Sequence, residues 1–222
     1  MNMNTNTGMG TTHLIIVIAV AGALLVAVVA GIWWFNSASD PNAMIERTVE
    51  QTISPDDLDI AFSFPSGPNG LTLIEPPLEG VAGGMLVDAF ILMERAAYQE
   101  YQAAEAGATA PPSISVFVFE AEAATGTDAA TSGERPDRMT RLRAWAREND
   151  ALSSRSLATE EPTEVEVDGL DMLRYTAAGT YDQDIYLGLY RGQVYLLVGQ
   201  YASTEDPIYA DFQSFIERIR FK

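Results

Sequence analysis

The longest run of apolar positions in the chain extends from Leu14 to Phe35 and contains no charged, amide or hydroxyl side chain. With a rise of about 1.5 Å per residue, its 22 residues form a helix of about 33 Å, close to the roughly 30 Å of a bilayer's hydrocarbon core. A cleaved signal peptide has a shorter apolar stretch after a basic segment, whereas the tail at 1–13 has no Lys or Arg. The pattern predicts a retained transmembrane helix, with Trp33 and Trp34 at the membrane interface.

A short linker separates this helix from the folded part of the chain. Asp40 and Pro41 form an N-cap and first-turn pair for a short helix that runs to about Gln51, and Ser54-Pro55 ends it. We therefore expect four parts: a polar tail at 1–13, a transmembrane helix at 14–35, a juxtamembrane linker with a short helix at 36–53, and a globular domain at 54–222.

The first half of the expected domain alternates strands with one helix. Apolar and polar positions alternate from Leu58 to Phe64, which is the period-two pattern of a half-buried strand. A stretch rich in Ala, Thr and Gly at 121–136 is typical of a loop or insertion. The other elements expected here are strands at 71–75, 85–93 and 114–120 and a helix at 94–106.

A second helix is predicted from Asp137 to Asn149. On a helical wheel its apolar residues share one face, and Arg143 and Arg147 point largely away from that face. The apolar face consists of Met139, Leu142, Trp145 and Ala146.

The last third predicts an antiparallel meander followed by a helix. A two-residue turn at Arg191-Gly192 pairs Tyr190 with Gln193, and both faces of the resulting hairpin are apolar. Such a sheet must be covered on both faces. The helix that begins at Pro207 supplies one cover, through a stripe of Ile208, Phe212, Phe215, Ile216 and Ile219. The four strands are expected at 163–168, 170–177, 184–190 and 193–201.

The order of these elements resembles the PsbP-like family, named for an extrinsic protein of photosystem II. The resemblance rests on an opening strand with Phe62 to Gly67, the Asp168-Gly169 turn before a meander around Tyr175-Thr176, Tyr195 to Val198, and Asp211 to Ile216. It implies an α+β fold with a central antiparallel β-sheet covered by helices on both faces, an α/β/α sandwich, here preceded by one transmembrane helix. It also implies a membrane-anchored bacterial form, and we carry no photosystem role over to this chain.

Charge and rare residues exclude several functions. The formal net charge is −18, and all charged residues lie at or beyond Asp40, so nucleic acid is disfavoured as a partner. The chain has no Cys, and its one His is His13, which removes Cys nucleophiles, His-based triads and Cys or His zinc sites from the folded domain. No short motif identifies a reaction. We expect no catalytic residues, no metal site and no cofactor, and hence no enzyme.

Two groups of charged residues remain candidates for binding. Glu164, Glu166 and Asp168 fall on one face of an expected strand, where they either attract Ca²⁺ or form a solvated face that blocks edge pairing. Arginines cluster on the helix at 137–149 and just before it, where they either contact an anionic partner or neutralise the acidic body of the domain itself. The arginines are Arg135, Arg138, Arg141, Arg143 and Arg147, and the contacts expected for a partner are Arg141, Arg143 and Arg147.

Together these features predict a single-pass protein of the inner (cytoplasmic) membrane whose C-terminal domain lies outside the cytoplasm. It is expected to act as a binding or accessory domain for a protein partner in a membrane or envelope complex. One alternative is a carboxylate-dependent hydrolase of envelope polymers, which needs two converging Asp or Glu side chains about 5 to 9.5 Å apart in a cleft. A second alternative is a pilin-like filament subunit.

Overall fold

The computed structural model describes residues 49–56, 58–78, 86–105, 107–121 and 137–222. The predicted transmembrane helix with Trp33 and Trp34 lies outside these residues, and so do residues 122–136 of the loop expected at 121–136. None of the described helices is both long and apolar enough to cross a membrane. The chain divides into units of 1–45 and 46–222, and the description below concerns the second unit alone.

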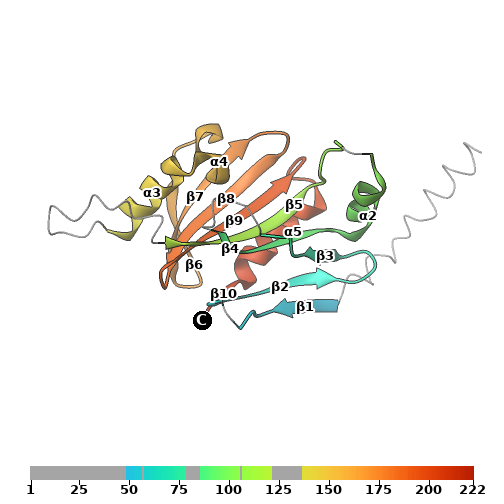
Figure 1. The fold of residues 1–222 in the computed structure, drawn as a ribbon, viewed down its shortest axis with the longest axis horizontal. Helices are drawn as coiled ribbons and strands as arrows, with labels where there is room; N and C mark the ends of the chain where they lie inside the picture. The colour runs from blue at the N-terminus through green and yellow to red at the C-terminus, as the bar shows by residue number, and fades with distance from the viewer. Residues whose placement is uncertain (1–48, 57, 79–85, 106, 122–136) are drawn as a thin grey trace, which may run out of the picture. The chain divides into compact units, whose positions relative to one another are not determined.

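A β-sheet forms the framework of this unit, and its strands follow the order β1-β2-β3-β4-β5-β9-β8-β7-β6, with β10 paired to β2 (Figure 1). Neighbouring strands are antiparallel except β2 and β3, which share a single parallel pair, Ser66 with Leu71. The antiparallel sheet predicted from the sequence is therefore correct apart from this junction. The strands are β1 (Val49–Ile53), β2 (Ile60–Ser66), β3 (Leu71–Ile74), β4 (Leu86–Glu94), β5 (Ser113–Glu120), β6 (Thr163–Val167), β7 (Leu170–Ala178), β8 (Asp182–Tyr190), β9 (Gln193–Tyr201) and β10 (Arg220–Phe221).

Helices α3 and α5 begin where the sequence places capping residues. The Asp137 side chain accepts a hydrogen bond from the Thr140 amide at the start of α3, and Asp206 caps α5 just before Pro207. The short α4 and η5 were not predicted. The described helices are α2 (Arg95–Ala103), α3 (Arg138–Glu148), α4 (Asp150–Ser153), the 3₁₀ turn η5 (Arg155–Leu157) and α5 (Pro207–Arg218).

Residues 49–51 form a strand, so the expectation of a helix running to about Gln51 is wrong there. β1 pairs antiparallel with β2 over its whole length, from Val49 opposite Ser66 to Ile53 opposite Phe62. The β-branched residues of this segment suit a pleated strand, and pairing with β2 supplies hydrogen bonds that an isolated short helix lacks. The folded domain therefore begins before Ser54.

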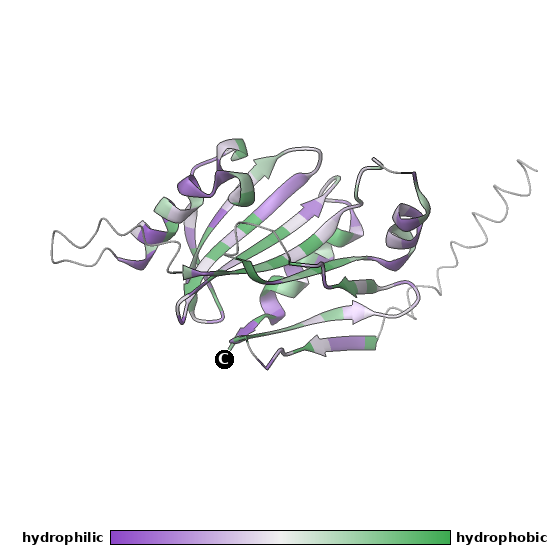
Figure 2. Cartoon of the chain, viewed as in Figure 1, coloured by the Kyte–Doolittle hydropathy of each residue, from purple (hydrophilic) through white to green (hydrophobic). Residues whose placement is uncertain are grey.

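The hairpin of β8 and β9 has the predicted register. Tyr190 lies opposite Gln193, and Tyr186 lies opposite Leu197. Its two faces belong to separate apolar clusters, one with Tyr186, Tyr195 and Leu197 and the other with residues such as Leu187 and Leu196. Figure 2, in which the ribbon is coloured by hydropathy, shows many hydrophobic positions along the central strands. A hairpin whose two faces are both apolar needs a packed layer of protein on each face.

Helix α5 covers the first face. Phe212 and Phe215 are fully buried, and the Phe212 ring meets the Tyr186 ring edge-on at 5.9 Å between centroids. The approach to β9 is so close that a Cβ atom at Gly199 would overlap the Phe212 ring. Glycine at this position therefore sets the distance between α5 and the sheet.

Helices α3 and α4 cover the second face. The buried Trp145 packs on Phe119 with ring centroids 5.1 Å apart. The Tyr175 hydroxyl donates to the Ser153 carbonyl oxygen at 2.7 Å, and the Ser153 hydroxyl donates to the Ala146 carbonyl oxygen at 2.6 Å. Tyr175 thereby ties the end of α4 to β7.

We expect Gly199→Ala to destabilise the domain by about 1–3 kcal/mol or more, because the added methyl group overlaps Phe212 and forces α5 from the sheet. Gly179→Ala is the matched control, since its added methyl group would meet its nearest neighbour at an ordinary 3.7 Å. Urea unfolding of both variants measures the difference. Equal stability of the two variants would contradict the packing of α5 described here.

A second prediction concerns the alkaline stability of the domain. Burial raises the pKa of Tyr175 from 10.0 to about 12. Below pH 10 the Tyr175 hydroxyl keeps its proton in both the folded and the unfolded state. Between about pH 10 and pH 12 it is ionised in the unfolded chain and still protonated in the folded domain. The free energy of unfolding therefore falls by about 1.4 kcal/mol per pH unit in this range because of this group.

We expect Tyr175→Phe to cost about 1–2 kcal/mol at neutral pH, because the Ser153 carbonyl loses its donor. The same variant should lose less stability than the parent between about pH 10 and pH 12. Urea unfolding at several pH values tests this. Parallel stability curves for parent and variant would show that the hydroxyl does not titrate as described.

Candidate functional site

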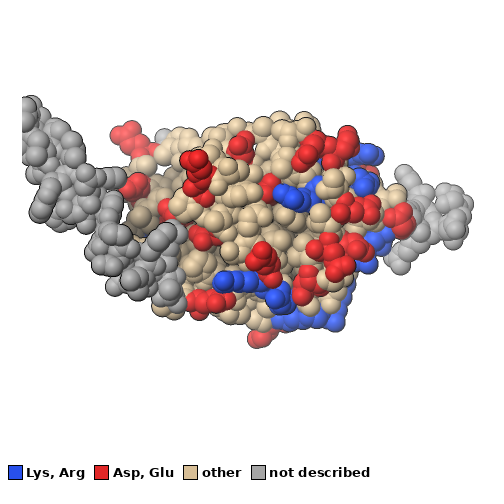
Figure 3. Space-filling view, turned by 180° about the vertical axis from the view of Figure 1, so that it is seen from behind, with Lys and Arg blue, Asp and Glu red and all other residues tan. Residues whose placement is uncertain are grey.

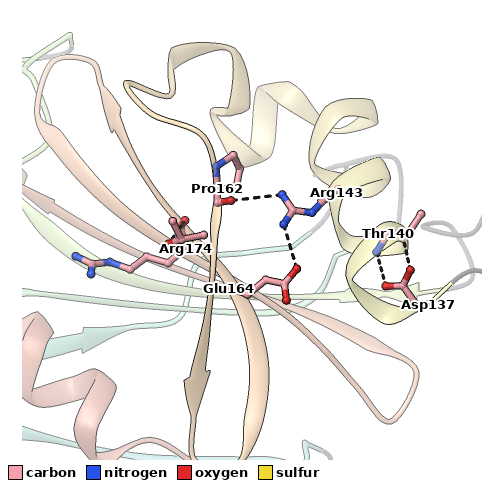
Figure 4. Close-up of polar contacts among 7 residues, drawn as sticks. Asp137, Thr140, Arg143, Pro162, Glu164 and Arg174 are labelled. Carbon is pink, nitrogen blue, oxygen red and sulfur yellow. Dashed lines mark hydrogen bonds and ion pairs between the residues drawn. The ribbon is translucent and has the colours of Figure 1, made fainter.

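The arginine-bearing side of α3 faces the start of β6 (Figure 4). The Arg143 guanidinium donates to a Glu164 carboxylate oxygen at 3.1 Å and to the Pro162 carbonyl oxygen at 3.4 Å. Arg138, at the start of the helix, lies 3.9 Å from the Asp171 carboxylate on β7. Two of the clustered arginines therefore neutralise acidic side chains of the domain itself.

The three arginines expected to contact a partner have different surroundings. Arg143 is half-buried and paired, as described above. Arg147, one turn further along α3, is exposed and makes no hydrogen bond or ion pair with any described residue. Arg141 is partly buried, and its Nε atom has no hydrogen-bond partner among the described residues. Arg135 lies outside the described residues.

The acidic residues of β6 do not form the single row expected from the sequence. Glu164 points toward α3, but Asp168 lies in the turn after the strand with φ of 50°. There it accepts a hydrogen bond from the Phe221 amide at 2.8 Å and lies 3.7 Å from the Arg220 guanidinium. The left-handed Asp168-Gly169 turn takes Asp168 out of the pleat of the strand, so the three side chains do not share one face. Among the described residues, no group of three or more His, Cys, Asp or Glu side chains is placed to hold a metal ion.

Basic side chains gather on one half of the surface shown in Figure 3, where acidic side chains are interspersed with them, and the other half shows acidic side chains alone. The sequence accounts for this asymmetry. In the described residues before 137, Arg95 is the one basic residue, whereas α3, η5, the β-meander, α5 and the residues after it carry the others.

A pocket that the sequence did not predict lies between β1, β3 and β4, with a volume of about 340 Å³. Glu75 and Asp88 are its two carboxylates. Asp88 accepts a hydrogen bond from the Ala89 amide at 2.8 Å, and Glu75 is exposed. The pairing of β3 with β4 brings Glu75 and Asp88 to the same pocket, and no local sequence pattern predicts this. The remaining lining residues are Thr52, Ile53, Ser54, Pro55 and Phe90.

A buried carboxylate was also missed. Asp184 is only 2% exposed and accepts hydrogen bonds from the Tyr201 hydroxyl at 3.3 Å and the Gln213 amide at 3.2 Å. The Arg174 guanidinium lies 3.5 Å from it. Burial, together with the Asp184 charge, raises the pKa of Tyr201 above its usual value. Because Gln213 lies on α5, this cluster fastens the helix to β8 and β9.

Comparison with known proteins gives a distant structural similarity. No family model matches the chain, and no curated protein matches it. The solution structure of cyanobacterial PsbP (CyanoP) from Synechocystis sp. PCC 6803 is similar at 14% sequence identity, over 78% of this chain and 92% of that one, with a TM-score of 0.46. PsbP-like proteins are also the family that the order of elements in the sequence resembles. At this distance the similarity bears on no activity or partner.

We expect Arg143 and Arg147 of α3 to differ in their effect on the stability of the domain. Arg143→Gln should lower the free energy of unfolding by no more than about 1 kcal/mol, because the pair with Glu164 is largely exposed and solvent screens it. Arg147→Gln should leave it unchanged within about 0.5 kcal/mol. A double-mutant cycle with Glu164→Gln should show coupling for Arg143 alone. Coupling of similar size for Arg147 would contradict the pairing.

Proposed function

We propose that this chain is a membrane-anchored accessory or scaffold domain that binds a protein partner, and that it is not an enzyme. Arg147 is the observation that supports this most directly. It is an exposed cation on a helix fixed by the buried Leu142, Trp145 and Ala146, and no described residue neutralises it. In a chain of formal charge −18, an exposed arginine that no described carboxylate pairs with is free to bind a carboxylate of a partner.

The geometry of α3 suits recognition of a carboxylate-rich surface. Trp145 packs on Phe119 and fixes the helix to the sheet, so Arg147 extends from a rigid backbone. Binding through this residue therefore costs little backbone conformational entropy. Arg143 lies one turn away, and its exposed pair with Glu164 is weak enough to be shared with an incoming carboxylate. A planar guanidinium binds a carboxylate through two parallel hydrogen bonds.

A membrane anchor makes a weak contact of this kind sufficient. Tethering at 14–35 confines the domain near a partner in the same membrane, and effective concentrations for short tethers reach the millimolar range. We propose the inner (cytoplasmic) membrane as its location, with the domain outside the cytoplasm. Two features of the sequence support this orientation: no basic cluster flanks the apolar segment, and long domains translocate largely regardless of charge.

The pocket between β1, β3 and β4 supports a second candidate, the carboxylate-dependent hydrolase of envelope polymers. Its lining includes two carboxylates, Glu75 and Asp88, and that chemistry uses a pair of Asp or Glu side chains. Against it, Glu75 is exposed to water, whereas the proton donor of such a pair usually has apolar surroundings. The pilin-like alternative has less support, because the first described element of the domain is a strand and not a continuing helix.

Co-purification of the full chain from membranes tests the proposal. We expect Arg147→Gln to reduce recovery of the partner several-fold, and rising salt to reduce it in the parent protein, because the contact is an exposed ionic one. Arg147→Lys should restore part of the recovery. Glu148→Gln is the matched control: it changes the charge of the neighbouring exposed residue by one unit and should leave recovery intact.

Unchanged recovery with Arg147→Gln would exclude α3 as the docking surface. Hydrolysis of cell-wall polymer by the parent chain, lost with Glu75→Gln, would favour the second candidate.

A further inference from the structure

The ion pair between Arg143 and Glu164 joins α3 to the edge strand β6 (Figure 4). Glu164 uses one carboxylate oxygen, 3.1 Å from the guanidinium, and its other oxygen bonds to no described residue. A second guanidinium nitrogen donates to the Pro162 carbonyl oxygen at 3.4 Å. The ionic contact of Arg143 therefore has a single hydrogen bond, where an arginine and a carboxylate can form two.

This ion pair opens at little cost in free energy. The side chains of Arg143 and Glu164 are 36% and 56% exposed, so water reaches both charges and screens their attraction. A released Glu164 carboxylate stays hydrated on the outside of β6. The Pro162 carbonyl belongs to the backbone, so it still holds the guanidinium beside α3 after the carboxylate has left.

Arg147 lies next to this pair on the helix. Arg143 and Arg147 are four residues apart on α3, so their side chains are neighbours, with Cβ atoms about 5 to 6 Å apart. Arg147 forms no ion pair with any described residue, so one carboxylate of a partner can bind it directly. A second carboxylate, one helical turn away, meets Glu164 in the place that it would take at Arg143. The two carboxylates have the same chemistry and compete for one guanidinium.

We propose that Glu164 is an internal competitor for the partner's carboxylate and thereby sets the strength of docking at α3. This inference rests on the proposed docking through Arg147 and deepens it. The partner presents two carboxylates about one helical turn apart, one for Arg147 and one that displaces Glu164 from Arg143. Without Glu164, the two guanidinium groups would also hold a single carboxylate between them, so Glu164 favours partners with paired acidic side chains.

Glu166 offers a matched control for Glu164. It lies two positions further along β6 on the same face, it is exposed, and it forms no ion pair with a described residue. Glu164→Gln and Glu166→Gln each remove one negative charge beside α3, so both reduce the general repulsion of an anionic partner by a similar amount. Only Glu164→Gln also frees a guanidinium.

The partner is unidentified, so glutarate, a short-chain dicarboxylate, is the probe for the full chain in neutral detergent. NMR of the Arg143 and Arg147 Nε–H groups follows its binding at constant ionic strength. We expect Glu164→Gln to bind glutarate about two- to fivefold more tightly than Glu166→Gln, because an exposed ion pair is worth up to about 1 kcal/mol and about 1.4 kcal/mol is a factor of ten. The Arg143 resonance should shift together with that of Arg147 in Glu164→Gln.

Co-purification of the full chain from membranes tests the competition with the partner itself. The readout is the protein that is recovered with the parent chain and lost with Arg147→Gln. Glu164→Gln should raise its recovery above that with Glu166→Gln. Adding Arg143→Gln should remove this gain, since no guanidinium is then freed. Urea unfolding of each variant confirms that the fold is retained.

Two outcomes would overturn the inference, and they differ in what they leave of the proposed function. If Arg147→Gln loses the partner but Glu164→Gln and Glu166→Gln are equal in either measurement, Glu164 is no competitor and docking through Arg147 still holds. If Arg147→Gln leaves recovery unchanged, the docking surface and the role of Glu164 are both excluded.

Discussion

The rest of the domain depends on the packing of the β8–β9 hairpin, which is apolar on both faces. A hairpin of this kind has no side that water can cover without cost, so each face needs its own layer. Helix α5 closes one side through Phe212, pressed against Gly199, and α3 closes the other through Trp145, packed on Phe119. The two apolar clusters share only the strands between them, which makes the sheet a partition between two cores.

This arrangement decides where charge can appear. Both faces of the central strands are covered, and the Asp184 carboxylate on β8 is buried there because Tyr201 and Gln213 donate hydrogen bonds to it. Most arginines are used within the domain: Arg143 with Glu164, Arg191 with Asp59, and Arg218 with Glu50. Such exposed ion pairs add little to the free energy of unfolding, but each arginine neutralises an acidic side chain next to it. Arg147 differs from them, because none of the described acidic residues forms an ion pair with it.

The two edge strands of the sheet, β1 and β6, have different surroundings. The arginine helix α3 lies beside β6, so the same element that guards one edge also carries the proposed docking surface. β1, at the other end of the strand order, pairs with β2 alone among the described residues.

The sequence by itself determined those features that depend on neighbours along the chain. The period-two pattern gave the meander of β6 to β9, the Arg191-Gly192 turn gave the register of its hairpin, and the apolar stripe after Pro207 gave α5. The arginines on the outer side of α3 were likewise located from the wheel of a single helix. Turn chemistry and periodicity act over a few residues, so they can be read locally.

Only the tertiary structure decided what depends on segments far apart in the chain. β1 is a strand because β2 pairs with it, and its own residues allow either conformation. Asp184 becomes a buried anchor because Gln213 and Tyr201 reach it from α5 and β9. Arg143 forms an ion pair because Glu164 on β6 lies within its reach from α3. The two carboxylates of the pocket, Glu75 and Asp88, come together because β3 pairs with β4. The physical reason is that each of these contacts joins residues whose separation in sequence carries no periodic signal, so their partners are fixed by packing alone.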